Sequence, residues 1–526
     1  MLKRTADPAT GGGTAPPGAA LRGQGLDAAA VARIADGATP ASPHPAALEA
    51  MERTRLAARR LAAEGARVYG RSTGVGAHRG QAVEEHDGAG HDLRLLLSHA
   101  GGVGEALPPR QVRAMMVVRA NQLLAGGSGS GPEIAVAVLD ALRAGVHPRV
   151  PEYGSVGTGD LTALAQLGLA LFGHGTWLRD DAGAENVFPG ARLPESLPLR
   201  HGDALALLSS NALTLGQSAL ASHDLGVPLR AAHPVAALSL YAVGGSVEPY
   251  APEVHAAHPH PAIAEAAARV RGLLGVGAGG GTAPQGMPGG VPARVQDPFG
   301  FRCFPQVHGP ATEAWSNLER VLSIDLNSAT ENPLIGWDET TGVPVALHHG
   351  GFFTAPLTLA LDQLGLAVLG TARLSAARLS GLGRPELTGL RSYLADASSA
   401  GSGMMILEYS AASALAEIQA CATPAALGHV VLSHGMEEAA TFATQAARKS
   451  LRLAPAYRLV LACELVAAVR ALRLRGTRPA PDTPAGRAYV RAAAVLDPDM
   501  RDRPLTDDVT AAAALLDEFA GLTGDD

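Results

Sequence analysis

The chain carries the stretch Tyr153-Gly154-Ser155-Val156-Gly157-Thr158-Gly159-Asp160-Leu161, in which three glycines alternate with hydroxyl and apolar side chains. Glycine permits backbone angles that other residues disfavour, so this pattern predicts a tight loop. The run from Leu164 to Phe172 follows it and is broken only by Gln166 and Gly168, which favours a buried helix. Asp160 stands before that run and is well suited to cap the helix. The stretch therefore predicts a glycine-rich loop that ends where a helix begins.

Composition favours a mainly α fold. The 526 residues are 47% apolar but only 4% aromatic, and alanine and leucine dominate. The net charge of −7, without a long basic run, excludes nucleic acid and an anionic membrane surface as expected partners. No apolar run is long enough to cross a bilayer. We expect a cytoplasmic protein, and three separated thiols (Cys303, Cys421 and Cys463) suit that reducing compartment.

The organisation along the chain indicates three parts. Residues 1–24 predict a disordered tail, residues 25–230 an N-terminal part, and residues 231–526 a long-helix bundle with a flexible Gly/Pro-rich loop at 274–293. Alanine- and leucine-rich periodicity predicts helices at Met51 to Glu64, Leu93 to Ala100, Val112 to Ala125, Glu313 to Asn327, Pro356 to Leu379, Met404 to Ala420, Met436 to Leu453 and Tyr457 to Leu474. Helices of this length and low charge pack on many sides, as in a bundle.

Several motifs occur in a fixed order from about residue 25 to about residue 475. Beside the opening stretch they are Tyr69-Gly70 with Thr73-Gly74-Val75-Gly76, Leu97 to Gly104, Arg113 to Asn121, Gln296 to Gln306, Glu331-Asn332-Pro333-Leu334 and Ala416-Glu417. In this order they resemble the aromatic amino-acid ammonia-lyases, which act on histidine, phenylalanine or tyrosine. The resemblance implies a helical homotetramer whose active sites take residues from several subunits, and a small amino-acid substrate.

The resemblance also implies roles for single residues. Tyr69 would remove the β-proton of the substrate, and Arg302 would hold its carboxylate, which a guanidinium fork fits in a bidentate manner. His99 and Glu417 would contact the ring or the amine. The remaining positions expected to line the substrate site are Ser209, Asn211, Gln296, Phe299 and Phe353.

The family motif reads Gly-Ser-Val-Gly-Ala-Ser-Gly-Asp-Leu, and its Ala-Ser-Gly cyclises into an electrophile, 4-methylidene-imidazol-5-one (MIO). Here the motif is one residue shorter, and Gly157, Thr158 and Gly159 occupy the catalytic positions. A ring made from threonine would carry an extra methyl group on the electrophilic carbon, which hinders attack. We therefore expect no cofactor and no MIO group, and we interpret Thr158 as a loop hydroxyl.

Other departures lie at neighbouring positions of the same motifs. Phe299 replaces a tyrosine, and Ser209 stands where the family has an asparagine that contacts the electrophile. Phe352 and Thr354 replace the asparagine and histidine of Gly-Gly-Asn-Phe-His. These changes cluster on the groups that build and serve the prosthetic group, whereas Tyr69, His99, Arg302 and Glu417 remain.

Two chemistries are compatible with a lyase that turns an aromatic or histidine-like α-amino acid into an acrylate. In the first, a modified prosthetic group forms and ammonia leaves. In the second, no such group forms and the leaving group is intrinsically better. The trimethylammonium group of a betaine, of the kind that an ergothionase-like enzyme cleaves, is an example. We prefer the second. A rival from another class is a non-catalytic binding or assembly protein that keeps the bundle.

Two other features favour plainer interpretations. Glu437-Glu438 is interpreted as a solvated pair, whereas Glu417 is interpreted as a buried functional carboxylate because burying an isolated charge is costly. His255, His258 and His260 have neither helical nor finger spacing, so we expect no metal site.

Overall fold

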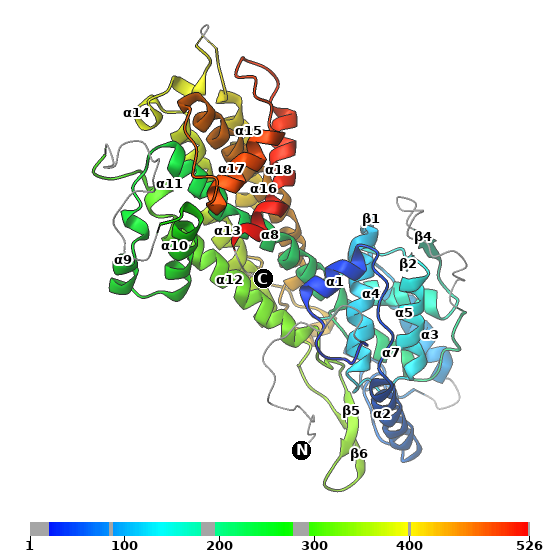
Figure 1. Cartoon of the computed structure of the whole chain (residues 1–526). Coiled ribbons are helices and arrows are strands. Elements are labelled where there is room, and N and C mark those ends of the chain that lie inside the picture. Colours follow the sequence, from blue (N-terminus) through cyan, green and yellow to red (C-terminus); the bar gives the residue numbers. More distant parts are fainter. Residues whose placement is uncertain (1–19, 84–87, 180–194, 277–293, 398–400, 524–526) are drawn as a thin grey trace. The chain divides into compact units, whose positions relative to one another are not determined.

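The computed structural model describes residues 20–83, 88–179, 195–276, 294–397 and 401–523, and it is mainly helical, as predicted (Figure 1). Most of the predicted tail (1–24) and of the predicted flexible loop (274–293) lies outside the described residues. Within the described part, Leu21 pairs through its backbone with Ser42 and His44, so the last residues of the expected tail are held in place.

Two compact units make up the chain, and each combines three segments. Unit 1 contains Met1–His223, Leu318–Leu361 and Ala425–Arg448, and unit 2 contains Asp224–Asn317, Asp362–Pro424 and Lys449–Asp526. Four of the boundaries fall inside long helices, namely α8 (Ala212–Ala242), α12 (Phe304–Asp325), α13 (Ala355–Leu382) and α16 (Ala443–Arg475). The predicted division between residues 230 and 231 falls within α8.

Unit 1 joins short helices to small two-stranded sheets. Its elements before α8 are α1 (Ala28–Ala35), α2 (Pro45–Ala63), α3 (Gly88–His99), β1 (Val103–Ala106), α4 (Pro109–Leu124), α5 (Pro132–Arg143), β2 (Val146–Pro148), β3 (Pro151–Tyr153), α6 (Leu161–Leu171), β4 (Trp177–Arg179) and α7 (Asp203–Leu208). The antiparallel pairs are β1 with β3, β2 with β4, and β5 (Leu334–Asp338) with β6 (Val343–Leu347). The β1–β3 pair ends at Tyr153, which delivers the chain to the glycine-rich loop.

Unit 2 is built from helices. Besides its shares of the four long helices, it contains α9 (Pro252–Ala257), α10 (Pro261–Leu274), α11 (Phe299–Arg302), α14 (Pro385–Thr388), α15 (Met405–Cys421), α17 (Pro484–Val495) and α18 (Thr506–Ala520). A buried ion pair between Arg378 and Glu464 joins α13 to α16, and its nitrogen–oxygen distance is 2.6 Å. The hydroxyls of Ser239 and Ser375 donate to the same carboxylate, so the charge buried in this bundle is fully hydrogen-bonded.

The helix predictions hold in most places, with two corrections. Residues 436–442 are not helical, so the prediction of a helix from Met436 is wrong at its start. The rest of that helix and the one predicted at Tyr457 to Leu474 form a single helix, α16, which continues through Pro455. Proline removes one backbone donor, but the apolar faces on both sides of it stay buried and hold the helix together.

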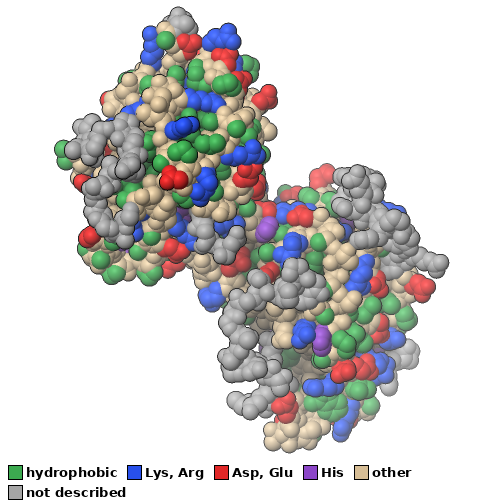
Figure 2. All heavy atoms as spheres, in the orientation of Figure 1, with side chains coloured by type: hydrophobic (Ala, Val, Ile, Leu, Met, Phe, Trp, Pro, Cys, Tyr) green, Lys and Arg blue, Asp and Glu red, His purple; other side chains and the backbone are tan. Residues whose placement is uncertain are grey.

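Two further features concern the surface and the apolar helices. On the face seen in Figure 2, basic and acidic side chains are interspersed with apolar ones. Contrary to the sequence expectation, one helix among the described residues, α13, is long and apolar enough to cross a membrane, although 56% of its most apolar window is buried in the protein. Burial of that kind is also found in core helices of globular proteins.

Candidate active site

The glycine-rich loop links β3 to α6, and hydrogen bonds of its own hold it in shape. Gly157 and Gly159 have φ angles of 86° and 136°, which favour glycine. Ser155 Oγ donates to Asp160 Oδ1 at 2.7 Å. A backbone turn of this kind, closed by a buried carboxylate, presents the side chain at 158 at its tip.

Asp160 occupies the position before α6, but its side chain caps a different helix. It makes no capping bond to α6, so the predicted side-chain cap there is wrong. Instead Asp160 Oδ2 accepts the Thr214 N–H at 2.7 Å, in the first turn of α8. Burial raises the pKa of Asp160, and the bonds from Thr214 and Ser155 act in the opposite direction. The carboxylate thus ties the loop to the start of α8.

Two threonine hydroxyls hold the carbonyl of Gly157. Thr441 Oγ1 donates to it at 2.9 Å, and Thr354 Oγ1 donates to it at 3.1 Å. The neighbouring Phe442 N–H donates to the Val156 carbonyl at 2.8 Å. The loop is therefore fixed by two segments that are distant in sequence.

Thr158 is bonded to an acidic residue: its Oγ1 donates to Glu437 Oε2 at 3.0 Å. The prediction that Glu437 belongs to a merely solvated pair is therefore wrong for this residue, which is half-buried. Glu437 is a candidate site residue that the sequence prediction lacks. The signal for it was its match to the glutamate of the family's Gln-Glu-Asp, which Met436-Glu437-Glu438 replaces.

The backbone at position 157 does not accommodate the alanine of the Ala-Ser-Gly from which the family forms its ring. A Cβ atom on Gly157 would lie 2.1 Å from Thr441 Oγ1 and 2.8 Å from the backbone nitrogen of Ala443. An alanine at this position would therefore need the 441–443 segment to move.

Tyr69 lies on the second glycine-rich loop of unit 1 and is half-buried. Its phenol oxygen accepts the Gly76 N–H at 2.7 Å, and its own N–H donates to His348 Nε2 at 3.2 Å. Gly70 has a φ angle of 66°, which favours glycine, and a Cβ there would lie 2.3 Å from Leu205 Cδ2, so a larger residue would require the Leu205 side chain on α7 to move. The phenol is therefore held at a defined place on the loop.

One arginine and two buried carboxylates lie close together beneath the Tyr69 loop. Arg71 donates to the Ser128 carbonyl at 3.0 Å. Burial lowers the pKa of Arg71, and the carboxylates of Asp92 and Asp203 oppose that shift. Burial raises the pKa of Asp203 to about 6. The arginine and the two carboxylates thus fasten the loop to the start of α7.

His99 is the last residue of α3 and is half-buried. Its Nδ1 lies 2.9 Å from the Leu95 carbonyl oxygen. A carbonyl only accepts, so this bond places the ring proton on Nδ1 and leaves Nε2 as an acceptor. An acceptor nitrogen suits a substrate ring or amine that donates.

Ser209, Asn211 and Phe353 come together next to the loop. Ser209 Oγ accepts the Asn332 N–H at 2.8 Å, and Asn211 Nδ2 donates to the Phe352 carbonyl at 2.7 Å. The structure therefore brings these three predicted positions into one region of unit 1, beside Thr354 and the Gly157 carbonyl.

A buried ion pair fixes the backbone on which Ser209 sits. Arg119 and Glu331 are 0% and 2% exposed, and their nitrogen–oxygen distance is 2.9 Å. Arg119 also donates to the carbonyls of Leu207 and Ala206. The pair therefore fastens the end of α7 to the segment that contains Asn332.

The other predicted residues belong to unit 2. The Arg302 guanidinium lies over the Phe299 ring, 4.5 Å from its centroid, and its buried Nε finds no partner within the part of the chain that the structure describes. A buried donor that lacks a partner is costly, so this geometry favours an anionic ligand. Gln296, which precedes Arg302 by six residues, is exposed.

Glu417 also lies in unit 2, on α15, and it is not buried. Its side chain is 58% exposed and pairs with Arg452 at 2.6 Å. The interpretation of Glu417 as a buried charge is therefore wrong for the single chain, and its role at the site stays a prediction.

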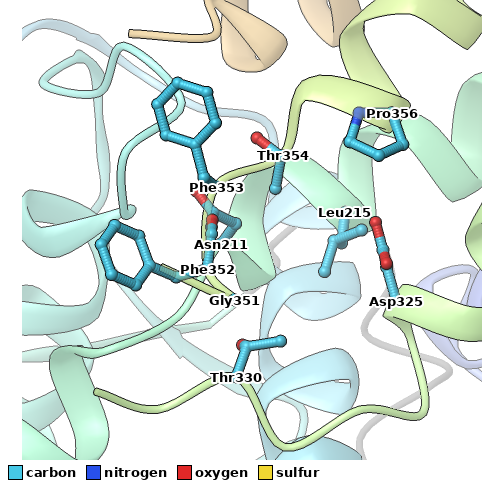
Figure 3. A pocket seen from close by; sticks show the side chains of 9 residues that line it. All are labelled: Asn211, Leu215, Asp325, Thr330, Gly351, Phe352, Phe353, Thr354 and Pro356. Carbon is cyan, nitrogen blue, oxygen red and sulfur yellow. The ribbon is translucent and has the colours of Figure 1, made fainter. Parts of the chain in front are cut away.

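A cavity of about 120 Å³ lies beside the loop in unit 1. It is lined by Asn211, Leu215, Asp325, Thr330, Gly351, Phe352, Phe353, Thr354 and Pro356 (Figure 3). Thr354 therefore contributes both to the cavity and to the anchoring of Gly157.

Comparison with known proteins places these features in a family. A family model described as aromatic amino acid lyase matches residues 26–494. A histidine ammonia-lyase from Anaeromyxobacter dehalogenans (strain 2CP-C) is 36% identical over 514 residues, which are 95% of this chain and 98% of that protein.

Two solved structures show the same fold. The crystal structure of histidine ammonia-lyase from Trypanosoma cruzi matches with a TM-score of 0.83 and 27% identity, over 96% of this chain and 94% of that chain. The ergothionase from Treponema denticola, described as an ergothioneine-degrading enzyme, matches with a TM-score of 0.82 and 24% identity, over 95% and 99% of the two chains.

Proposed function

The chain belongs to the aromatic amino acid lyase family, whose members are carbon–nitrogen lyases, and from this premise we propose its reaction. It eliminates an amine from an aromatic or histidine-like α-amino acid and yields the corresponding acrylate. The histidine ammonia-lyases among its relatives support an imidazole ring in the substrate. Which ring the substrate carries, imidazole or another aromatic ring, is the more specific part of what we propose.

The observation that carries the proposal is the fixed phenol of Tyr69. The bond from the Gly76 N–H orients its oxygen, on a loop whose glycines allow it to close over a substrate. Tyr69 takes the β-proton, the electrons of that C–H bond form the double bond, and the Cα–N bond breaks so that the amine leaves with its electron pair.

The remaining groups bind the substrate. Arg302, with its buried partnerless Nε among the described residues, holds the carboxylate, and His99 accepts from the ring or the amine. Glu417 contributes from α15. We propose a cytoplasmic homotetramer that shares these residues among subunits. Exposed apolar side chains on the unit 2 helices support an interface there, namely Leu366, Ile406, Tyr409 and Leu459.

A second candidate differs in the leaving group. The poor fit between Gly157 and the alanine of the family motif favours a reaction without MIO. Ammonia then leaves too poorly, whereas a neutral tertiary amine released from a trimethylammonium betaine leaves well. The phenyl rings of Phe299 and Phe353 are 64% and 40% exposed, and aromatic faces bind quaternary cations. We prefer this betaine reaction.

The test combines a substrate panel with intact mass. Histidine, phenylalanine, tyrosine and their trimethyl betaines are incubated with the full chain, and a new conjugated-acrylate absorbance is recorded. We expect product from a betaine and an intact mass equal to that of the sequence. A mass lower by two waters, with ammonia released from a free amino acid, would instead support the first leaving group. No product from any compound would favour a non-catalytic binding protein.

A further inference from the structure

Two residues that line the cavity beside the glycine-rich loop carry acceptors without a partner among the described residues. Asn211 is 2% exposed; its amide nitrogen donates to the Phe352 carbonyl, and its Oδ1 has no hydrogen-bond partner among the described residues. The half-buried carboxylate of Asp325 forms neither an ion pair nor a hydrogen bond within the same described ranges. Figure 3 shows Asp325 on one side of the cavity and the two phenyl side chains on the other.

Unsatisfied acceptors of this kind favour a donor with positive charge. Burying a carbonyl oxygen and a carboxylate without partners costs free energy, which a cation with several N–H groups would recover. Burial raises the pKa of Asp325 to about 6, so its carboxylate still carries its charge at neutral pH. No basic side chain lines the cavity, so this negative charge is not neutralised from the lining.

The size of the cavity limits the ligand. Its volume of about 120 Å³ is below the roughly 150 Å³ of a protein cavity that admits benzene. A whole aromatic amino acid is therefore too large, whereas ammonium or a methylated ammonium fits.

The cavity adjoins the glycine-rich loop, and its lining segment also reaches the Tyr69 loop: the Tyr69 N–H donates to His348 Nε2 at 3.2 Å, and Gly351, three residues further on, lines the cavity. Thr354 lines it and donates to the Gly157 carbonyl at 3.1 Å. Asn211 follows Ser209 by two residues and shares its place at the end of α7. A small product released beside the Tyr69 loop would therefore find these groups on a neighbouring segment.

We infer that this cavity binds the departed amine as a small ammonium ion, once the amine has taken up the proton that Tyr69 removed or one from water. Ammonium donates to both Asn211 Oδ1 and the Asp325 carboxylate, whereas trimethylammonium, with its single N–H, donates to the Asp325 carboxylate. The inference rests on the proposed function, because it assigns the site to the leaving group of that reaction. Binding there would keep the amine from re-adding to the acrylate while the larger product leaves.

The test measures binding to the resting protein, without substrate. Ammonium chloride and trimethylammonium chloride are titrated into the full chain at constant ionic strength, with potassium chloride as the matched salt, and binding is followed by calorimetry and by saturation-transfer NMR of the methyl signals. We expect saturable binding that Asp325→Asn weakens about tenfold or more, the loss typical of one charge-assisted hydrogen bond. Leu215→Phe, which fills the cavity from α8, should abolish binding of trimethylammonium.

The matched control is Asp140→Asn, which removes the same charge from a surface pair with Arg143 on α5 and should leave binding unchanged. Circular dichroism and thermal melting establish that each variant is folded. Equal affinity of wild type and Asp325→Asn, or equal binding of potassium, would overturn the inference. Failure of the substrate panel alongside retained ammonium binding would refute the proposed reaction and leave an ammonium site, so the two failures are distinguishable.

Discussion

The buried pair of Arg119 and Glu331 offers a direct test of how the site is held together. The variant Glu331→Gln keeps the shape of the side chain and removes its charge. Arg119 then stays 0% exposed, with only neutral acceptors around its guanidinium. Leaving one buried charge without its counter-ion typically costs about 3–5 kcal/mol, and we expect a loss of that size in the free energy of unfolding.

The surface pair of Asp140 and Arg143 provides the comparison. Its side chains are 52% and 28% exposed, so Asp140→Asn should cost less than about 1 kcal/mol. The double variant Arg119→Met/Glu331→Leu removes both buried charges at once. Its loss should fall short of the sum of the losses of Arg119→Met and Glu331→Leu, each measured singly, by about 1–3 kcal/mol, the usual coupling between contacting groups.

Urea unfolding at a fixed protein concentration measures these differences, because an oligomer's stability depends on concentration. A loss for Glu331→Gln no larger than that of Asp140→Asn would refute the claim that the pair fastens α7 to the Asn332 segment. Strict additivity in the double variant would refute it as well, since it would mean that the two charges do not depend on each other.

Three further predictions concern activity and pH. Tyr69→Phe should lower kcat by about 10²–10⁴-fold in the acrylate assay while the melting temperature stays close to that of wild type, and an unchanged kcat would exclude the phenol as base. Arg302→Lys should raise KM more than it lowers kcat, because lysine cannot form the bidentate fork, and steady-state kinetics would show the reverse if Arg302 does not bind the carboxylate. The pKa of Asp325 is raised by burial from 3.8 to about 6, so its contribution favours the fold below about pH 4 and is lost as the pH rises through 6. Asp325→Asn should therefore gain stability relative to wild type across that window, by at most about 3 kcal/mol, and a flat difference in urea unfolding between pH 4 and 7 would contradict this.

Most helices were predictable from sequence because their periodicity reports burial directly. The helix predicted at Met51 to Glu64 lies at Pro45–Ala63, and Gly65 follows it with a φ angle of 68°. The helix prediction is wrong for residues 436–442. Their charges and alanines suit a helix locally, but their backbone bonds to the glycine-rich loop instead. Phe442 donates to Val156, and that long-range bond has no local signal.

For the candidate site, the sequence predicted which residues lie there but not which hydrogen bonds they make. Motifs identify Ser209, Asn211 and Phe353, which the structure does bring into one region, but they cannot show which hydrogen bonds a side chain already makes. Asp160 illustrates the difference: its position fits a cap for α6, yet its carboxylate serves α8, which begins about fifty residues later. The exposure of Glu417 and its pairing with an arginine on another helix likewise cannot be read from the sequence, because both depend on how the helices pack.

The departures from the family motif are also structurally consistent with one another. A glycine at 157 leaves room for Thr441 to reach its carbonyl, and a Cβ there would meet that hydroxyl at 2.1 Å. Thr354 reaches the same carbonyl with a side chain that is smaller than the histidine of the family motif. Thr158 in turn has Glu437 as its acceptor. Loss of selection would leave buried polar groups without partners, whereas here each altered hydroxyl has one. The loop is therefore an internally consistent structure that differs from the family motif, and it agrees with the reaction without MIO that we propose.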